Sequence, residues 1–450
     1  MPRAAKSGGP AIGKATGMTQ TQHHVVVIGA GFAGLTAVQK MKHLGARITL
    51  IDRQNHHLFQ PLLYQTATAV LSVDDVAWPV RRLLKGRKDV TVLQADVTGI
   101  DRAAKTVILK DGAPLPFDTL VIATGTVTSY FGHDAWQHDA PGLKTADDAL
   151  RLRTRIFGAL ERAERESDPQ KRAAHQTFAV IGGGPTGVEL AGMISNLCHR
   201  VLKGEFRHID PADCRILLVE GGPRLLGPFA ESLSSYTARV LKERGIEVLT
   251  GKIVKEVSAQ GIVWGDGPDE RIECATTVWA AGVAGTPAAQ WLGVAPDKGN
   301  RIAVGGDLTL PDDPDIFVIG DVAAVPWKDG VVPGLAPAAK QMGGHVARTM
   351  RHRLKGGPMP KPFAYRDYGS LATIGQGAAV IQYGQLHLRG LLAWWGWGVA
   401  HIFFLITLRN RVTVMLNWVW FTLFGRNAAR VTFSEMTEPS SQARKAPPQS

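Results

Sequence analysis

Cysteine is scarce in this chain of 450 residues, which contains only Cys198, Cys214 and Cys274. No two of them form a C-x-x-C or C-x-x-x-x-C pair, and the chain has no Cys/His cluster with metal-ligand spacing. The sequence therefore argues against a disulfide framework and predicts no metal site. A chain this poor in cysteine suits a reducing compartment.

A secretory signal and a nucleic-acid-binding run are also missing. Residues 1–22 contain no acidic residue and no apolar core of a signal peptide, so we expect a flexible extension, with a transit peptide as the alternative and Met1 or Met18 as the start. The body of the chain has no Lys/Arg-rich run interleaved with aromatic residues. The net charge of +12 therefore points to nucleotide phosphates or an anionic lipid surface rather than nucleic acid. Residues 434–450, rich in Ser, Pro, Gln and Lys, are expected to be a disordered tail.

A glycine-rich fingerprint follows a short apolar strand expected at residues 25–28, with Gly29, Gly31 and Gly34 at the spacing G-x-G-x-x-G. In this motif the first glycine permits a tight turn, the second lets the backbone approach a pyrophosphate, and the third lets helix and strand pack closely. Asp52 ends the next expected strand, about 20 residues on, where its carboxylate is placed to accept hydrogen bonds from a ribose.

A second fingerprint follows the apolar strand expected at residues 178–181, with Gly182, Gly184 and Gly187 at the same spacing. One such motif is weak evidence because glycines recur in turns. Two copies, each between a strand and a helix, predict two bound nucleotides and electron transfer between them.

Three further residues belong to the second nucleotide site. Glu220 ends the next expected strand and suits the free 2′-OH of NADH, although Arg224 nearby leaves some use of NADPH open. Gly282 lies in a small-residue turn that is either a simple tight turn or a place where a nicotinamide or flavin ring lies against the backbone. Glu189, close after the fingerprint, either compensates the helix dipole or acts beside the nicotinamide and flavin in hydride or proton transfer.

Two other apolar strands resemble the auxiliary motifs of the two-dinucleotide-binding flavoprotein superfamily. Residues 120–125 end in Ala-Thr-Gly, and residues 315–321 end in Gly-Asp. The resemblance implies that FAD occupies the first site and that Asp321 holds its ribityl chain. The other FAD contacts that it implies in these segments are Thr124, Gly125 and Gly320.

The predicted fold is α/β, with two Rossmann-like dinucleotide-binding domains, the second inserted in the first, and a C-terminal helical membrane-anchoring region. The FAD-binding domain is expected to be discontinuous, comprising residues 23–144 and 300–364. The NADH-binding domain is expected at residues 145–299, and the membrane-association region at residues 365–433.

The C-terminal region is apolar and rich in tryptophan. Residues 391–408 carry no formal charge and reach the lower length limit of a spanning helix, and residues 412–424 form a second apolar run. Asn410, Thr413 and Asn417 fall on one helical face, which is an amphipathic pattern. We interpret the region as an interfacial anchor on anionic lipid, with a buried core or dimer interface and a true span as alternatives.

Several segments resemble the type II NADH:quinone oxidoreductases, and the resemblance runs from about residue 23 to residue 433. Members of that family bind FAD non-covalently and NADH, and reduce a membrane quinone without pumping protons. Their quinone site is described by the pattern Ala-Gln-x-Ala-x-Gln, in which Pro337 replaces the first glutamine here and Gln341 matches the second. The segments that carry the resemblance are residues 55–65, 129–133, 140–145, 219–226 and 336–341.

The resemblance implies a respiratory NADH:quinone oxidoreductase, with Glu189 and Gln341 as catalytic residues and Gln341 also beside the FAD. It implies a homodimer, peripheral on the cytoplasmic face of the bacterial inner membrane, and leaves ubiquinone and menaquinone open. A disulfide reductase would need paired cysteines. Two alternatives are a sulfide:quinone oxidoreductase-like enzyme, which would need a cysteine after Cys274, and an NADH-responsive flavoprotein that acts through partner binding.

Overall fold

Six strands from distant parts of the sequence form the first sheet of the computed structural model, which describes residues 22–328, 330–424 and 431. The strand order is β20-β21-β9-β1-β2-β5, and all neighbours are parallel except β20, which pairs antiparallel with β21. The strands are β1 (His24–Ile28), β2 (Arg47–Asp52), β5 (Val90–Gln94), β9 (Thr119–Ile122), β20 (Thr309–Leu310) and β21 (Asp313–Val318).

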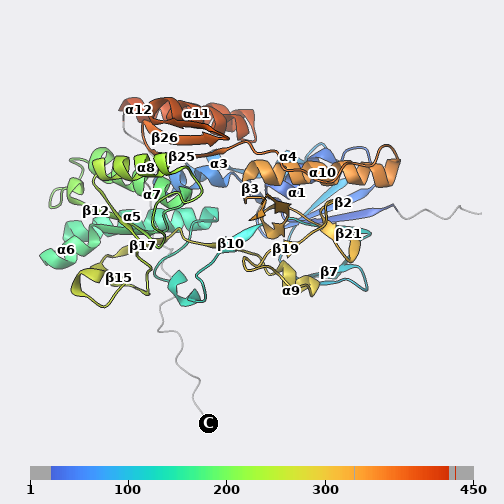
Figure 1. Cartoon of the computed structure of the whole chain (residues 1–450), viewed down its shortest axis with the longest axis horizontal. Helices are drawn as coiled ribbons and strands as arrows, with labels where there is room; N and C mark the ends of the chain where they lie inside the picture. The colour runs from blue at the N-terminus through green and yellow to red at the C-terminus, as the bar shows by residue number, and fades with distance from the viewer. Residues whose placement is uncertain (1–21, 329, 425–430, 432–450) are drawn as a thin grey trace, which may run out of the picture.

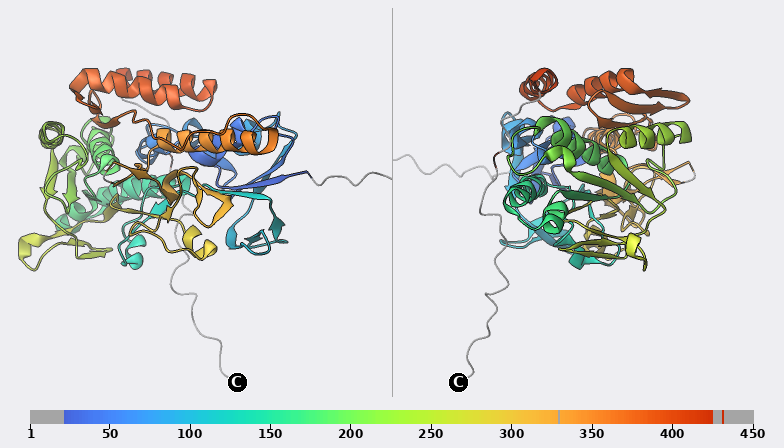
Figure 2. Two further views of the ribbon diagram at one scale, coloured as in Figure 1. Left: turned by 45° about the vertical axis from the view of Figure 1, so that its right-hand side comes forward. Right: turned by 90° about the vertical axis from the view of Figure 1, so that its left-hand side faces the viewer.

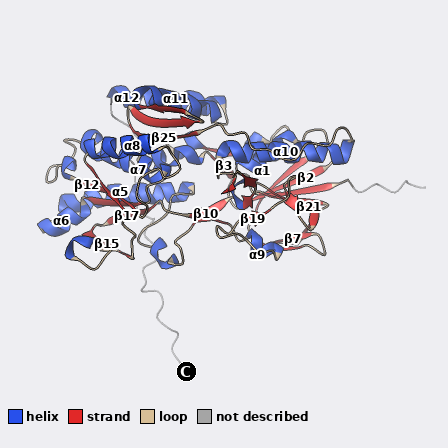
Figure 3. Ribbon diagram, viewed as in Figure 1, coloured by secondary structure: helices blue, strands red, loops and turns tan. Residues whose placement is uncertain are grey.

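The second sheet has four parallel strands in the order β13-β12-β11-β17. Because β21 follows this sheet in sequence yet pairs with β9 of the first sheet, the second domain is inserted in the first, as predicted. Figure 3 shows both sheets with helices packed against them. The strands are β11 (Thr177–Ile181), β12 (Arg215–Glu220), β13 (Ile246–Thr250) and β17 (Thr276–Trp279).

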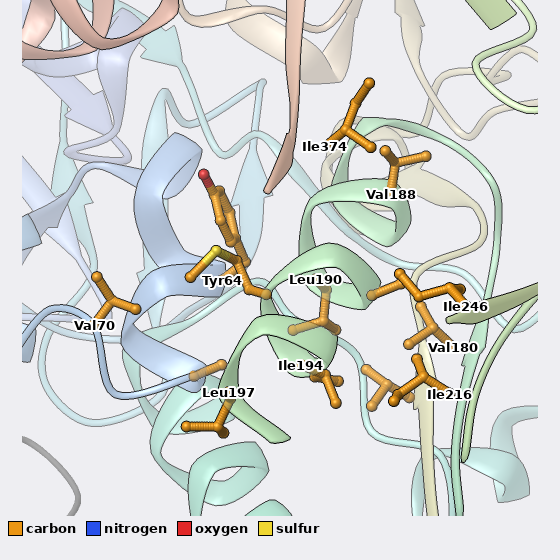
Figure 4. Packing of buried hydrophobic residues seen from close by; sticks show 14 of the residues in the cluster. Tyr64, Val70, Val180, Val188, Leu190, Ile194, Leu197, Ile216, Ile246 and Ile374 are labelled. Carbon is orange, nitrogen blue, oxygen red and sulfur yellow. The ribbon is translucent and has the colours of Figure 1, made fainter. Parts of the chain in front are cut away.

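Buried apolar side chains join the second sheet to its helices. Figure 4 shows Leu190 and Ile194 of α7 (Pro185–Asn196) between Ile216 of the sheet and Tyr64 of α2 (Leu63–Ala67). The same core extends to α5 (Ala146–Arg165). The short helix α2 therefore belongs by sequence to the first domain and by packing to the core of the second.

Two long helices lie side by side over the first sheet, α1 (Phe32–Lys40) and α10 (Ala336–Lys355) (Figure 1). Their backbones approach closely, because a Cβ on Gly343 of α10 would lie 3.0 Å from the amide nitrogen of Ala37. This contact brings the start of α10 next to the first glycine-rich turn.

The two segments by which the chain enters and leaves the second domain lie next to each other. In them, β10 (Thr126–Thr128) pairs antiparallel with β18 (Val283–Gly285). The helix α9 (Ala288–Leu292) follows, and its Ala288 and Leu292 are buried in the core around the first sheet. The range 145–299 expected for the NADH-binding domain therefore includes a helix whose core contacts are with the first domain.

Short sheets and further helices complete the two domains. The antiparallel minor sheets are β3 (His56–Leu58) with β4 (Ala77–Pro79), β6 (Val97–Asp101) with β7 (Thr106–Leu109) and β8 (Leu115–Pro116), β14 (Glu256–Ser258) with β15 (Gly261–Val263) and β16 (Arg271–Glu273), and β23 (Pro326–Trp327) with β24 (Gly330–Val331). A parallel pair is formed by β19 (Ile302–Ala303) and β22 (Ala323–Ala324). The remaining helices are α3 (Val73–Val76), α4 (Val80–Leu83), α6 (Pro169–His175) and α8 (Glu231–Glu243).

The C-terminal region is a three-stranded antiparallel sheet followed by two helices, and the sequence analysis did not anticipate the sheet. The strands are β25 (Ser370–Gly375), β26 (Ala378–Tyr383) and β27 (Leu386–Arg389). The helices are α11 (Gly390–Phe404) and α12 (Leu408–Phe424), which Figure 2 shows at one edge of the molecule.

The long apolar run at residues 391–408 is interrupted after Phe404, so it does not form one helix. Among residues 22–328 and 330–424 no helix has both the length and the apolar character needed to cross a bilayer. The expected tail at residues 434–450, and all but the last residue of the expected extension at residues 1–22, lie outside the described residues.

Candidate active site

The three glycines of the first fingerprint serve different purposes. Gly29 has a φ of +104°, and a Cβ there would collide with the carbonyl group of Ala123, while a Cβ on Gly34 would collide with the carbonyl oxygen of Gly29. A Cβ on Gly31 would meet no protein atom within 4 Å. Packing of the protein therefore explains Gly29 and Gly34, whereas the space in front of Gly31 is open to a ligand at the N-terminus of α1.

A cavity of about 550 Å³ opens in front of this turn. It is large enough for a substantial part of a dinucleotide. Of the residues predicted to bind FAD, it is lined by Gly29, Gly31, Asp52, Thr124, Gly125, Gly320 and Asp321. The structure thus brings together residues from the ends of β1, β2, β9 and β21, with Gly34 behind the turn.

Asp52 stabilises the glycine-rich turn from the end of β2. Its Oδ2 accepts a hydrogen bond of 2.6 Å from the amide of Ala30, and its Oδ1 accepts one of 2.8 Å from the amide of Gln54. Burial raises the pKa of the Asp52 carboxyl, and these two backbone bonds oppose the shift. A carboxylate can accept about four hydrogen bonds, so two sites stay open for a ribose.

Lys144 is a cavity residue that the sequence analysis did not assign, although it lies in the segment 140–145. Its Nζ donates a hydrogen bond of 3.1 Å to Oγ1 of Thr126. Burial lowers the pKa of the Lys144 amine, and the charge of Asp321 opposes that shift. Burial likewise raises the pKa of Asp321, and Lys144 opposes it. Thr286 also lines the cavity, with its hydroxyl hydrogen-bonded to that of Thr124 at 2.5 Å.

The second fingerprint repeats this geometry. Gly182 has a φ of +112°, a Cβ on Gly187 would collide with the carbonyl oxygen of Gly182, and a Cβ on Gly184 would meet nothing within 4 Å. Glu220 ends β12 as Asp52 ends β2, and its Oε2 accepts a hydrogen bond of 2.5 Å from the amide of Gly183. The same physical reasoning therefore indicates a second dinucleotide at the N-terminus of α7.

Arg224 is held by its own loop. Its two terminal nitrogens donate hydrogen bonds of 2.7 Å and 2.6 Å to the carbonyl oxygens of Phe229 and Gly227. Because these bonds engage the guanidinium, the side chain is not poised for a 2′-phosphate beside Glu220.

A smaller cavity of about 140 Å³ lies where the two nucleotide sites meet. It is lined by Tyr64 of α2, Glu189 of α7, Lys144 and Gly282, so it combines residues from both domains. Gly282 has a φ of +77° and packs against the ring of Phe131. Lys144 lines both this cavity and the larger one, and so marks the place where they adjoin.

Glu189 is buried in this smaller cavity. Its Oε1 accepts a hydrogen bond of 3.3 Å from the amide of Thr373 in β25. Burial raises the pKa of the Glu189 carboxyl to about 8, against the effect of that bond. Glu189 lies beyond the first turn of α7, so compensation of the helix dipole does not explain it. A carboxyl group with this pKa holds a proton at neutral pH and can exchange it.

Gln341 lies apart from the other predicted site residues. Its Nε2 donates a hydrogen bond of 2.9 Å to the carbonyl oxygen of Arg366, and its Oε1 accepts one of 2.9 Å from the amide of the same residue. It lines a different cavity, whereas Ala339 on the same helix lines the larger nucleotide cavity. Cys198, Cys214 and Cys274 are buried free thiols, and none lines either nucleotide cavity.

Protein-family models show the class of protein to which the chain belongs. A protein-family model described as pyridine nucleotide-disulphide oxidoreductase matches residues 23–343, which span both nucleotide sites. A second model, described as the NDH2 C-terminal domain, matches residues 368–427.

Individual relatives show which family within this class the chain belongs to. The chain is 42% identical over 414 residues to the type II NADH:quinone oxidoreductase Ndh of Mycobacterium tuberculosis, covering 90% of this chain and 89% of the relative. It is 32% identical over 371 residues to a type II NADH:quinone oxidoreductase of Staphylococcus aureus, covering 80% of this chain and 89% of the relative. The chain belongs to the family of type II NADH:quinone oxidoreductases.

Solved structures show the same fold. The structure of NDH2 from Plasmodium falciparum in complex with NADH matches with a TM-score of 0.82 at 21% identity, covering 90% of this chain and 99% of that one. The sulfide:quinone oxidoreductase of Aquifex aeolicus matches with a TM-score of 0.69 at 19% identity, covering 90% and 96%.

Proposed function

We propose that this protein is an FAD-dependent NADH:quinone oxidoreductase that takes a hydride from NADH and passes two electrons to a membrane quinone without pumping protons. The observation that carries the proposal is the cavity at the junction of the two nucleotide sites, where a buried, protonated Glu189 faces the space between them. Bound FAD supplies the redox chemistry, since a flavin accepts a hydride from one substrate and returns electrons to another.

The protein's own residues orient the two nucleotides. Gly31 and Asp52 are proposed to hold the pyrophosphate and a ribose of FAD, and Gly184 and Glu220 those of NADH. Lys144 brings a positive charge to the boundary between the cavities. A cation there favours negative charge on whatever is bound beside it.

Glu189 is proposed to hold a proton that the quinone takes up. Reduction of a quinone to a quinol takes two electrons and two protons; the hydride from NADH supplies both electrons and one proton, and Glu189, protonated at neutral pH, can supply the other. Tyr64 lines the same cavity as Glu189, and its hydroxyl accepts a hydrogen bond of 3.1 Å from Nε2 of Gln65. The predicted contact of Gln341 with quinone stays a prediction, and it requires the amide to leave its two bonds to Arg366.

The membrane contact is proposed from the two C-terminal helices. Asn410 of α12 donates a hydrogen bond of 2.7 Å to the carbonyl oxygen of Asp75, and Asn417 donates one of 3.1 Å to the Asp75 carboxylate. The polar face of α12 therefore turns toward the protein, and its apolar face turns outward. We name the outward side chains the apolar surface: Leu391, Leu392, Trp395, Val399 and Phe403 of α11, with Leu408, Leu416, Val419, Trp420 and Leu423 of α12.

Exposed aromatic and aliphatic side chains on two short helices suit insertion into the headgroup region of a bilayer. We propose that the apolar surface docks peripherally on the cytoplasmic face of the bacterial membrane, with Arg409 and Arg411 at the anionic headgroups. A quinone, whose tail is apolar, then reaches the enzyme without leaving the lipid. The homodimer stays a prediction.

Rapid mixing tests the electron transfer. The full-length protein with bound FAD is reduced by NADH without oxygen and then mixed with a soluble quinone. We expect the absorbance of oxidised flavin to return on the timescale of turnover. Failure of the quinone to restore it would overturn the proposal.

Docking is tested separately by membrane fractionation of L392E/L416E, with I253E as the matched control. Ile253 is 71% exposed in the second domain, next to Gly221, whereas Leu392 is 78% exposed on α11. We expect the double variant to appear in the soluble fraction and the control to stay with membranes. Equal membrane retention of both variants would contradict docking through this surface.

A further inference from the structure

A second large cavity follows α10, and Gln341 is the one predicted site residue that lines it. It has a volume of about 740 Å³ and lies between α10, the end of α1 and the segment at residues 356–364. We name it the basic groove after the cations that line it, which are Lys40, Lys340, Arg348, Arg351 and Lys361.

The cations of the basic groove lack acidic partners. Within residues 22–328 and 330–424, none of the five forms an ion pair. Arg351 donates a hydrogen bond of 3.3 Å to the backbone carbonyl oxygen of Lys40. This bond neutralises neither the charge of Arg351 nor that of Lys40. The charge of Asp307 acts on the nearby His345, so one carboxylate lies near the groove. Five positive charges around one cavity outnumber it and favour an anionic ligand.

The dipole of α10 does not explain this cluster. A helix C-terminus favours cations in its last turn, and in α10 that turn holds His352, Arg353 and Lys355. Lys340 lies in the other half of the helix, outside that last turn. Lys40 and Lys361 lie on other segments.

The groove opens next to the apolar surface. Phe404, the last residue of α11, lines it. The Nζ of Lys340 lies 3.5 Å from the carbonyl oxygen of Phe404 and 5.1 Å from the centre of its ring. Figure 1 shows α10 running beside and below α11. A molecule whose apolar part lies against α11 can therefore place a charged end in the basic groove.

We propose that the basic groove binds the phosphate-bearing headgroup of an anionic membrane lipid. The inference rests on the proposed docking of the apolar surface. A quinone head is neutral and gains little from five cations, while a single inorganic phosphate would leave most of the cavity unfilled. A headgroup of glycerol and one or two phosphates, tethered by acyl chains beside Phe404, matches the charge, the size and the position of the groove.

The test uses the full-length protein with bound FAD and vesicles of phosphatidylcholine alone or mixed with phosphatidylglycerol. The variant R348Q/R351Q removes two charges from the groove, and neither residue belongs to the nucleotide sites. The control K171Q/R271Q removes two exposed charges near α6 and β16, at the far end of the second domain (Figure 1). We expect the groove variant to bind mixed vesicles at least about tenfold more weakly, since each cation near an anionic surface contributes about fivefold. The control is expected to bind like the unaltered protein.

Three results would overturn the inference. The first is an equal loss of binding to mixed vesicles in the control variant, and the second is equal binding of the unaltered protein to neutral and mixed vesicles. The third is saturation of the groove by inorganic phosphate, seen in a thermal-shift titration, at phosphate concentrations that also block vesicle binding. Reoxidation by a soluble quinone is measured on the same preparations. R348Q/R351Q should keep that reaction. If quinone does not reoxidise the flavin of the unaltered protein, the proposed function is contradicted. If reoxidation occurs but the unaltered protein does not prefer mixed vesicles, only the proposal for the basic groove is contradicted.

Discussion

The indole nitrogen of Trp418 on α12 donates a hydrogen bond of 2.7 Å to the Oε1 of Gln65 on α2. The Nε2 of Gln65 in turn donates one of 3.1 Å to the hydroxyl of Tyr64, which lines the cavity that contains Glu189. Hydrogen bonds thus connect a helix of the apolar surface with the junction of the two nucleotide sites.

Replacing Trp418 by phenylalanine removes the indole N–H that makes this connection and part of the packing against Trp397. The Oε1 of Gln65 loses its partner in a buried place, which costs about 1–3 kcal/mol of stability. We expect a lower melting temperature and a severalfold lower kcat with quinone, measured by calorimetry and steady-state assay. Trp395→Phe is the control, because that side chain is 61% exposed. Equal effects of both substitutions would show that the hydrogen bond is unimportant.

Glu189→Gln should change how activity depends on pH. The unaltered enzyme holds a proton on Glu189 below its pKa of about 8 and loses it above, so quinone reduction should fall as pH rises through about 8. Glutamine has the same shape and no exchangeable acidic proton, so we expect at least about a tenfold lower rate with no such fall near pH 8. The measurement is the rate of flavin reoxidation by soluble quinone as a function of pH, compared between the unaltered enzyme and the variant. An unchanged profile in the variant would assign the proton to another group.

The same substitution should raise stability at alkaline pH. The carboxyl of Glu189 titrates near 4.5 when exposed and near 8 when folded, so the folded state binds more protons between these values. Stability of the unaltered protein therefore falls as pH rises from about 4.5 to about 8, and Glu189→Gln removes that contribution. We expect the difference in melting temperature, variant minus unaltered protein, to increase as pH rises across this range. The exposed Glu231→Gln is the control and should show no such trend.

Much of this site could be read from the sequence because its parts are local. A strand, a glycine turn and an acid at the next strand end occupy residues 24–52 in the first site and 177–220 in the second, and the chain alone specifies their relation. The placement of Gln341 could not be read, because its partner is the backbone of Arg366, which has no sequence signal. The amphipathic face of α12 could be read from the sequence, but its partner could not, because Asp75, which accepts the hydrogen bonds of Asn410 and Asn417, belongs to a distant part of the chain.

Glu220 should determine the choice between NADH and NADPH. Its carboxylate keeps capacity for a ribose hydroxyl and repels a 2′-phosphate, so Glu220→Gln should raise the KM for NADH about tenfold and lower the preference for NADH over NADPH. Arg224→Gln should leave that preference unchanged, because its guanidinium is bound to the carbonyl oxygens of Gly227 and Phe229. Steady-state assays with both nucleotides give the ratios. A gain of preference for NADH on Arg224→Gln would show that the arginine does reach the 2′ position.

Gly31→Ala and Gly34→Ala should fail in different ways, although both add one methyl group to the same turn. At Gly31 the backbone has an ordinary φ of −68°, and a Cβ meets no protein atom within 4 Å. The apoprotein should therefore keep its melting temperature, while the methyl group stands in the cavity and lowers the FAD content of the purified protein severalfold. At Gly34 the Cβ collides with the carbonyl oxygen of Gly29, so α1 must move away from the first sheet.

That displacement costs about 1–3 kcal/mol, as overpacking usually does, and lowers the melting temperature of the apoprotein itself. The two readouts are flavin absorbance per protein and the melting temperature after removal of the cofactor. Full FAD occupancy in Gly31→Ala would mean that the space in front of α1 does not receive the pyrophosphate. The dinucleotide would then enter the cavity in another orientation, with Asp321 rather than the glycine-rich turn as its principal contact.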